Sequence, residues 1–333
     1  MTDMVVNYWG VRGSIPTPLT AEELLRNQLE LIERLRKDGI PEPAYVQQYL
    51  DTISSEITRT FGGDTPCIEI QIPDSPLIII DAGTGIRRLG LDIKDIRGNR
   101  YNPMSNIGNT EVHILLTHFH WDHVQGFPFF NPAYDSNTIL HVHGRRVQGE
   151  SIESILNKQQ QAPLFPVPLS KMTSSRSFHS HDLPIIPFGI GNAHVEYRFL
   201  EHPQEVLAYA ISYNGKKMVC ATDTEHKNVP DPRFVSLAKN ADILIYDSQY
   251  TPEDYPLKKG WGHSTYEEGI KIALAANTKC LVLFHLEPTY DDRKLAQMER
   301  DAQEYARQQL KLPENIGKEL QVVVAYQGMV QKI

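Results

Sequence analysis

A short apolar strand that runs directly into a cluster of metal-binding side chains constrains this chain more than any other feature. Val112 to Leu116 has the apolar character of a buried strand, and Thr117 to His123 follows as Thr-His-Phe-His-Trp-Asp-His. Four potential ligands therefore stand within six residues: His118, His120, Asp122 and His123. Imidazole and carboxylate groups together suit zinc, manganese or iron. The segment predicts a metal centre at the end of a strand.

The spacing within this segment predicts two metal ions. Alternate side chains of an extended segment face the same way, so His118 and His120 can bind one ion side by side. A turn then presents Asp122 and His123 to a second ion about 3.5–4 Å away, the usual separation in two-metal sites. The alternative, a chance cluster of surface histidines, does not account for the apolar flanks and the strand.

Composition excludes several classes of protein. The chain has 333 residues, 41% of them hydrophobic, which is enough for a large core. Its net charge of -8 and lack of a Lys/Arg block argue against a protein that grips a long nucleic acid. The sequence shows neither a run of 18 apolar residues nor a secretory signal, so no membrane partner is expected. Three cysteines in apolar runs are interpreted as buried hydrophobes of a cytoplasmic protein.

Strands and helices alternate along most of the chain. Apolar runs bounded by turn residues predict the following strands: 4–9, 67–72, 77–80, 112–116, 139–142, 195–200, 207–212, 217–221, 243–246, 281–284 and 320–325. Two segments interrupt this pattern. Residues 20–59 are expected to form two helices, the first of which begins with a capping box made by Thr20 and Glu23. Residues 144–185 are expected to form one helix followed by a long loop.

The segment at 117–123 resembles the HxHxDH signature of the metallo-β-lactamase superfamily. The resemblance covers almost the whole chain outside residues 20–59. It implies an α/β fold, an αββα sandwich with the site at one edge between the two sheets, formed by residues 1–333 as a single domain. Residues 20–59 are then a helical-hairpin insertion near the N-terminus, which either decorates the surface or acts as a lid or a partner-binding pair of helices.

The same resemblance implies four further site residues. Asp81 follows a strand as in the family's strand-Asp-x-Gly segment, where the carboxylate orients a metal-binding histidine. His202 matches the third histidine of the first ion, and Asp223 matches the carboxylate that bridges both ions. His285 matches the last ligand of the second ion. Each of these residues could instead be a buried polar residue at a strand end.

Apart from His263, which is discussed below, seven histidines lie outside this set. We interpret three of them as structural strand residues and three as solvated residues in or near the long loop: His113, His141 and His143, then His179, His181 and His194. His226 follows Asp223 closely and is expected to line the substrate pocket.

Two divalent ions, zinc or manganese with iron also compatible, define the expected chemistry. Ions that share an aqueous ligand lower its pKa from about 15.7 toward about 7, so that a bridging hydroxide acts as the nucleophile. Asp122 is counted among the catalytic residues as well as the ligands. This chemistry serves phosphodiesters, thioesters and lactams alike.

Two elements between Asp223 and His285 favour phosphodiesters. Asp247 after a strand, and Gly262-His263-Ser264-Thr265 before a helix, are similar to the Glu and His-Ser-Thr elements of the phosphodiesterase branch that includes ribonuclease Z. The resemblance implies that Asp247 orients His263, which stabilises developing charge or protonates the leaving alkoxide. The alternative is that Ser264 or Thr265 only caps a helix, and both interpretations can hold together.

The expected substrate is a small phosphodiester such as a cyclic nucleotide. We find no Gly/Pro-rich basic arm of the kind that ribonuclease Z uses to hold tRNA, and Asp64 places a negative charge where relatives carry Asn. Asp64 is therefore a candidate pocket residue. The alternative is a ribonuclease Z-like RNA endonuclease, in which residues 20–59 or a homodimer interface supply positive surface. A non-catalytic metal-binding sensor or scaffold is a third hypothesis.

Overall fold

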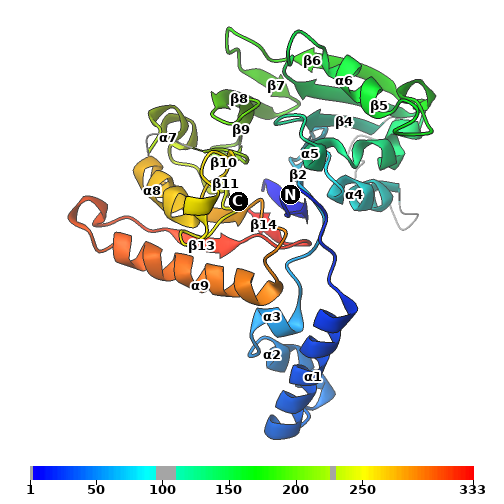
Figure 1. Ribbon diagram of the computed structural model, residues 1–333. Coiled ribbons are helices and arrows are strands. Elements are labelled where there is room, and N and C mark those ends of the chain that lie inside the picture. Colours follow the sequence, from blue (N-terminus) through cyan, green and yellow to red (C-terminus); the bar gives the residue numbers. More distant parts are fainter. Residues whose placement is uncertain (1–2, 95–109, 226–229) are drawn as a thin grey trace.

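Two seven-stranded sheets face each other, and helices cover the outer side of each (Figure 1). The computed structural model describes residues 3–94, 110–225 and 230–333. The arrangement is the αββα sandwich that the sequence predicts. Cys67, Cys220 and Cys280 are buried and form no disulfide, as expected.

The second sheet keeps the order of its strands along the chain, and the first does so except for β14, which lies at the edge beside β1. The first sheet contains, from edge to edge, β14 (Val330–Lys332), β1 (Val5–Gly10), β2 (Cys67–Gln71), β3 (Leu77–Ile80), β4 (Thr110–Leu115), β5 (Thr138–Gly144) and β6 (Ser175–Ser180). The second sheet contains β13 (Gln321–Val324), β12 (Cys280–Phe284), β11 (Ile243–Asp247), β10 (Lys216–Ala221), β9 (Val206–Tyr213), β8 (Ala193–Leu200) and β7 (Phe188–Ile190).

Parallel pairing positions the site. Strands β3 to β6 pair in parallel, and so do strands β10 to β13. Strands that are buried on both faces have continuous apolar runs, as β11 and β12 do. Because the strands of a parallel set end at a common edge, the polar residues that follow them gather there.

The helices fall into three groups. The first sheet is covered by α4 (Gly85–Lys94), α5 (Trp121–Val124) and α6 (Ile152–Gln159), and the second by α7 (Pro232–Ala238), α8 (Tyr266–Ala276) and α9 (Asp292–Gln309). The third group is α1 (Ala21–Asp38), α2 (Val46–Leu50) and α3 (Ser55–Thr58), which lies below the sheets in Figure 1. Short 3-10 turns occupy Pro43–Tyr45, Phe127–Phe129, Asn131–Tyr134, Leu169–Lys171, Tyr255–Leu257 and Pro313–Asn315.

The segment 20–59 is helical, but its second half is broken. Thr20 and Glu23 form the expected capping box at the start of α1. The single second helix that the apolar spacing predicts is divided into α2 and α3, because residues 51–54 (Asp-Thr-Ile-Ser) form a turn there. Short polar side chains compete for backbone groups, and the Thr52 hydroxyl donates to the Tyr49 carbonyl.

The long loop expected within 144–185 contains a strand. Residues Ser175–Ser180 form β6, which pairs with β5 at the edge of the first sheet. Its sequence Ser-Arg-Ser-Phe-His-Ser shows no apolar alternation, because the strand is half exposed along most of its length. His179 therefore lies in a sheet rather than in a loop. Among the described helices, none combines the length and the apolar character that crossing a membrane requires.

Close backbone packing joins β3 to the segment that follows β4. The amide of Ala82 donates to the His123 carbonyl, and the amide of Gly126 donates to the Ala82 carbonyl. A Cβ atom at Gly83 would lie 2.4 Å from the Asp122 carbonyl oxygen and 2.6 Å from that of Pro66. These atoms belong to backbone that cannot move aside cheaply, so only glycine fits.

We therefore expect the Gly83→Ala substitution to destabilise the protein by about 1–3 kcal/mol, the usual cost of overpacking. Urea unfolding of the metal-free protein measures this free energy. Gly189→Ala is the matched control, because the nearest atom to its added Cβ would lie 3.7 Å away. Equal unfolding midpoints for the two variants would contradict the packing argument.

Candidate metal centre

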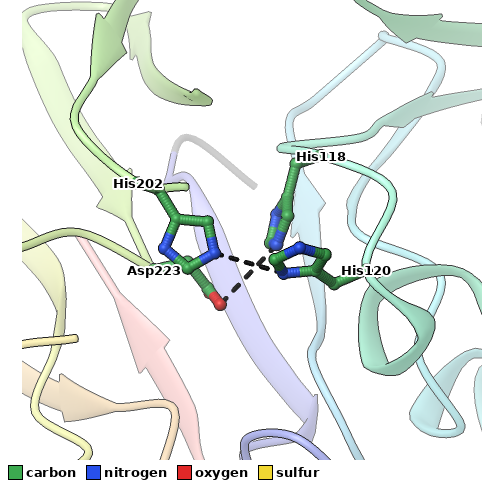
Figure 2. Close-up of side chains that lie close together, drawn as sticks. All are labelled: His118, His120, His202 and Asp223. Atoms are coloured by element: carbon green, nitrogen blue, oxygen red, sulfur yellow. Dashed lines mark hydrogen bonds and ion pairs between the residues drawn. The ribbon is translucent and has the colours of Figure 1, made fainter. Parts of the chain in front are cut away.

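Four side chains from both sheets converge at the common strand edge (Figure 2). His118 and His120 follow β4, His202 follows β8, and Asp223 follows β10. The His202 Nε2 atom lies 3.1 Å from His120 Nδ1, and His118 Nε2 lies 3.7 Å from Asp223 Oδ1. One ligand atom from each residue lies within 4.8 Å of those of the others.

A second cluster shares Asp223 with the first. It contains Asp122, His123 and His285, all of them buried. His285 Nε2 lies 3.0 Å from Asp122 Oδ2 and 3.2 Å from Asp223 Oδ1, while His123 Nε2 lies 3.2 Å from Asp223 Oδ2. Asp223 is thus common to both clusters, because its Oδ1 atom lies 3.2 Å from His285 Nε2 and 3.7 Å from His118 Nε2.

The donor atoms fit divalent cations. Among the described residues, His118 Nε2 is buried without a hydrogen-bond partner, which is costly unless a ligand completes the site. Burial lowers the pKa of His118 well below its ordinary value, so the imidazole is neutral, as a ligand must be. Burial also lowers the pKa of His123, but the carboxylates of Asp223, Asp122 and Asp81 outweigh it and raise this pKa well above its ordinary value. The centre therefore favours positive charge.

The Nδ1 atoms of four histidines are fixed by neighbouring groups. Each one is within hydrogen-bond distance of an oxygen, and we infer that it donates there and leaves Nε2 free for a ligand. The pairs are His123 with Asp81 at 2.8 Å, His285 with Gln249 at 3.0 Å, His202 with the Gly262 carbonyl at 2.8 Å, and His118 with the Thr117 hydroxyl at 3.1 Å. Asp81 also accepts hydrogen bonds from the amide and hydroxyl of Thr117.

Three site residues adopt a left-handed backbone within two residues of the ends of their strands. The φ angles are 62° at Asp81, 54° at Asp223 and 59° at His285. Side chains other than glycine rarely adopt this region, and each such residue costs on the order of 1–3 kcal/mol. Strain of this kind persists where surrounding contacts hold it, and it accompanies functional sites.

An aspartate–histidine pair lies beside both clusters. Asp247, the last residue of β11, is fully buried, and its Oδ2 atom lies 2.8 Å from His263 Nδ1. Its other oxygen accepts from the amides of Gln249 and Ser264. Burial lowers the pKa of His263, but the Asp247 carboxylate outweighs it and raises this pKa to about 9. The ring of His263 is centred 5.0 Å from that of His285.

Glu225 holds the loop that carries His263. Its carboxylate accepts from the amides of Gly260 and Gly262 and from the hydroxyl of Tyr255. The sequence alone does not predict a role for Glu225 or Gln249, although each stands two residues beyond a predicted site residue. Their positions close to Asp223 and Asp247 are the signal that could have found them.

Thr265 occupies the N-cap position of α8, as the capping interpretation predicts. Its side chain, however, makes no capping hydrogen bond. The hydroxyl of Ser264 instead pairs with that of Tyr246 at 2.8 Å. Ser264 therefore binds a buried tyrosine of the core, and no side chain caps the start of α8.

The structure brings together all seven predicted ligands, the supporting Asp81, and the Asp247–His263 pair. Asp64 lies elsewhere, in a pocket that it shares with Trp9 and Pro18. Its carboxylate is 2.9 Å from Arg88 Nε and accepts hydrogen bonds from Thr84 and Gln327. His226, the other expected pocket residue, lies outside the described residues.

A two-sheet sandwich with paired histidine–aspartate clusters at one strand edge defines the class of this protein, a metal-dependent hydrolase. The family model described as "Beta-lactamase superfamily domain" matches residues 77–286, which is more than half of the chain. The chain therefore belongs to the metallo-β-lactamase superfamily. This confirms the predicted family.

Ribonuclease Z proteins are among its relatives. That of Thermococcus kodakarensis is 24% identical over 306 residues, covering 77% of this chain and 88% of the relative. That of Brevibacillus brevis is 40% identical over 78 residues, a match that spans only 23% of each chain. Among solved structures, human tRNase Z, short form, aligns with a TM-score of 0.58 at 15% identity over 98% of both chains. A diphosphatase from the PhnP family aligns with a TM-score of 0.58 at 14% identity, over 99% of this chain and 98% of that one.

We expect the Asp81→Asn substitution to weaken metal binding about 10- to 100-fold, the usual effect of losing a charged partner behind a ligand. Zinc affinity measured by competition with a chromophoric chelator tests this. Asp242→Asn is the matched control, because Asp242 is also buried but lies before β11, where it binds Lys279 and the Lys217 amide. Unchanged affinity in Asp81→Asn would contradict the assigned role.

Proposed function

We propose that this chain is a phosphodiesterase that cleaves a small phosphodiester, such as a cyclic nucleotide, with two divalent ions. The observation that carries the proposal is the buried Asp247–His263 pair, which lies beside the two clusters. Such a pair supplies a positioned proton donor, which a phosphodiester needs for its leaving alkoxide. Relatives named ribonuclease Z and a structural neighbour named as a diphosphatase support a phosphate substrate.

The ligand assignment follows the two clusters. His118, His120 and His202 would hold one ion, and Asp122, His123 and His285 would hold the other, with Asp223 between them. Divalent ions bound there would lower the pKa of water and polarise the phosphoryl oxygens. Zinc and manganese both suit this set of ligands, and iron is compatible with it.

His263 would complete the reaction. Water attacks phosphorus, the bond from phosphorus to the leaving oxygen breaks, and the leaving oxygen takes a proton from His263 Nε2. Asp247 holds the opposite nitrogen and keeps the imidazole charged until transfer. Water or solvent buffer then returns a proton to His263.

The charge of the adjoining pocket favours a small substrate over a long RNA. Its lining includes His202 and Gly262 together with four carboxylates and one lysine: Glu201, Glu225, Glu267, Glu268 and Lys259. A polyanion is repelled by such a rim, whereas a single phosphodiester needs only the metal centre for charge compensation.

A ribonuclease Z-like endonuclease is the second candidate. The relative from Thermococcus kodakarensis, which aligns over 77% of this chain, favours it. Helix α1 does not offer a basic surface, because it carries five acidic and four basic residues: Glu22, Glu23, Glu30, Glu33 and Asp38, and Arg26, Arg34, Arg36 and Lys37. A precursor tRNA in the substrate panel distinguishes the two candidates.

We expect the His263→Ala substitution to lower kcat on cyclic nucleotides by about 10²- to 10⁴-fold, the usual contribution of a positioned acid. Chromatography of linear monophosphates, formed by zinc- and manganese-loaded protein, measures this. His194→Ala is the control, since His194 is an exposed histidine on β8. Metal content is measured alongside, because a fall in ion stoichiometry would mean that His263 supports the metal centre.

Cleavage of precursor tRNA without cleavage of any cyclic nucleotide would replace the first candidate with the second. No turnover of either substrate by a protein with full metal content would refute the phosphodiesterase proposal.

A further inference from the structure

Five histidines gather on strands β4 to β6, away from the metal centre described above. They occupy neighbouring positions of the parallel register, with His113 opposite His141 and His143 opposite His179. His181 follows directly after β6. His113 precedes His118 by five residues, a separation on the order of 15 Å along a strand. None of these histidines has a part in the proposed reaction.

Two of these histidines converge on one carboxylate. His113 Nε2 lies 3.1 Å from Glu111 Oε1, and His141 Nε2 lies 3.5 Å from the same atom. One ligand atom from each of the three residues lies within 4.8 Å of those of the others. The rings of the two histidines are stacked with centroids 4.4 Å apart.

The opposite nitrogens of both histidines are already engaged. His113 Nδ1 lies 2.9 Å from His143 Nε2, and His141 Nδ1 lies 3.1 Å from His179 Nε2. The chain of contacts continues from His143 Nδ1 to His181 Nε2 at 2.9 Å. Metal-binding histidines characteristically have their second nitrogen held in this way, which sets the ring orientation.

We propose that Glu111, His113 and His141 bind a divalent transition-metal ion, in addition to those of the metal centre. Two imidazoles and a carboxylate suit zinc, nickel or copper. Ligands at about 2.1 Å around a tetrahedral ion are about 3.4 Å apart, close to the separations of 3.1 and 3.5 Å between these donor atoms.

The centre at Asp223 provides an internal comparison. Its donor atoms, in the ligand set that the family resemblance implies, are separated by 3.1 Å between His202 and His120 and by 3.7 Å between His118 and Asp223. The Glu111 cluster thus has the donor types and the donor spacing of the first centre. It differs in exposure, because the Glu111 side chain is 45% exposed and the His141 side chain 22%. Water can therefore reach the remaining coordination position.

The paired strands β4 and β5 hold the three residues of this cluster in place before any ion binds. His113 and His141 are paired residues of adjacent parallel strands, and Glu111 lies two residues before His113 on the same strand. Ligands that stand on paired strands need little ordering when an ion binds. An ion there would link β4 to β5 and add to the stability of the folded chain.

The test is the zinc stoichiometry of the full-length chain in equilibrium dialysis at micromolar free zinc, measured by mass spectrometry. We expect the wild type to hold one zinc ion more per chain than the Glu111→Gln/His141→Asn variant. This difference does not depend on how far the main centre fills, so it is independent of the proposed function. His194→Ala, which changes an exposed histidine outside the cluster, should match the wild type.

Two further measurements exclude a folding defect. Zinc should raise the Tm of the wild type more than that of the double variant, while their metal-free Tm values and far-UV spectra agree. The single Glu111→Gln change alters only a half-exposed side chain and should weaken this zinc affinity on the order of tenfold or more. Equal zinc content in the wild type and the folded double variant would overturn the proposal and leave the histidines as a hydrogen-bonded ladder.

Discussion

The carboxylate of Asp223 connects the two sheets of this protein at the edge where the metal centre lies. It lies 3.7 Å from His118 and 3.2 Å from His123, which follow β4 in the first sheet. It also lies 3.2 Å from His285, which follows β12, a strand of the same second sheet as β10, which precedes Asp223. A buried carboxylate is costly unless positive groups surround it. The loops that follow β4, β10 and β12 are therefore arranged around one negative charge.

The metal centre could be predicted from the sequence because each ligand follows a strand that the sequence marks clearly. The runs before Asp223 and His285 are apolar, and the run before His118 is apolar except for His113, so the strand ends are visible in the sequence. Parallel pairing aligns the ends of β10 to β12 within the second sheet. The family resemblance singled out Asp81 and Asp247, which also stand at strand ends, and it implied the sandwich.

Residues whose roles depend on distant contacts were not predictable in this way. Glu225 fixes the loop before His263, because its carboxylate accepts hydrogen bonds from the amides of Gly260 and Gly262, 35 or more residues later. No local sequence pattern reveals that contact. Strand β6 was missed because an edge strand with a half-exposed surface needs no apolar alternation. The break between α2 and α3 arises from a polar turn within an apolar spacing that is otherwise helical.

The electrostatics of the site divide into two parts with different tasks. The buried part favours cations, because Asp81, Asp122 and Asp223 together raise the pKa of His123. Four glutamates and one lysine line the adjoining pocket, so under the proposed function a phosphate group would be attracted only near bound ions and near His263. Under that proposal, a substrate would be selected by how its phosphate reaches the centre while the rest of the molecule contacts an acidic surface.

The left-handed bends at Asp81, Asp223 and His285 limit how this centre could change during evolution or protein design. Aspartate, asparagine and histidine tolerate positive φ better than other side chains, apart from glycine. A glutamate or cysteine at these three positions would have to adopt a positive φ angle, which is unfavourable for these side chains whether or not they could bind a metal ion. Exchange of one metal preference for another is therefore easier at His118, His120 or His202, whose φ angles are not positive.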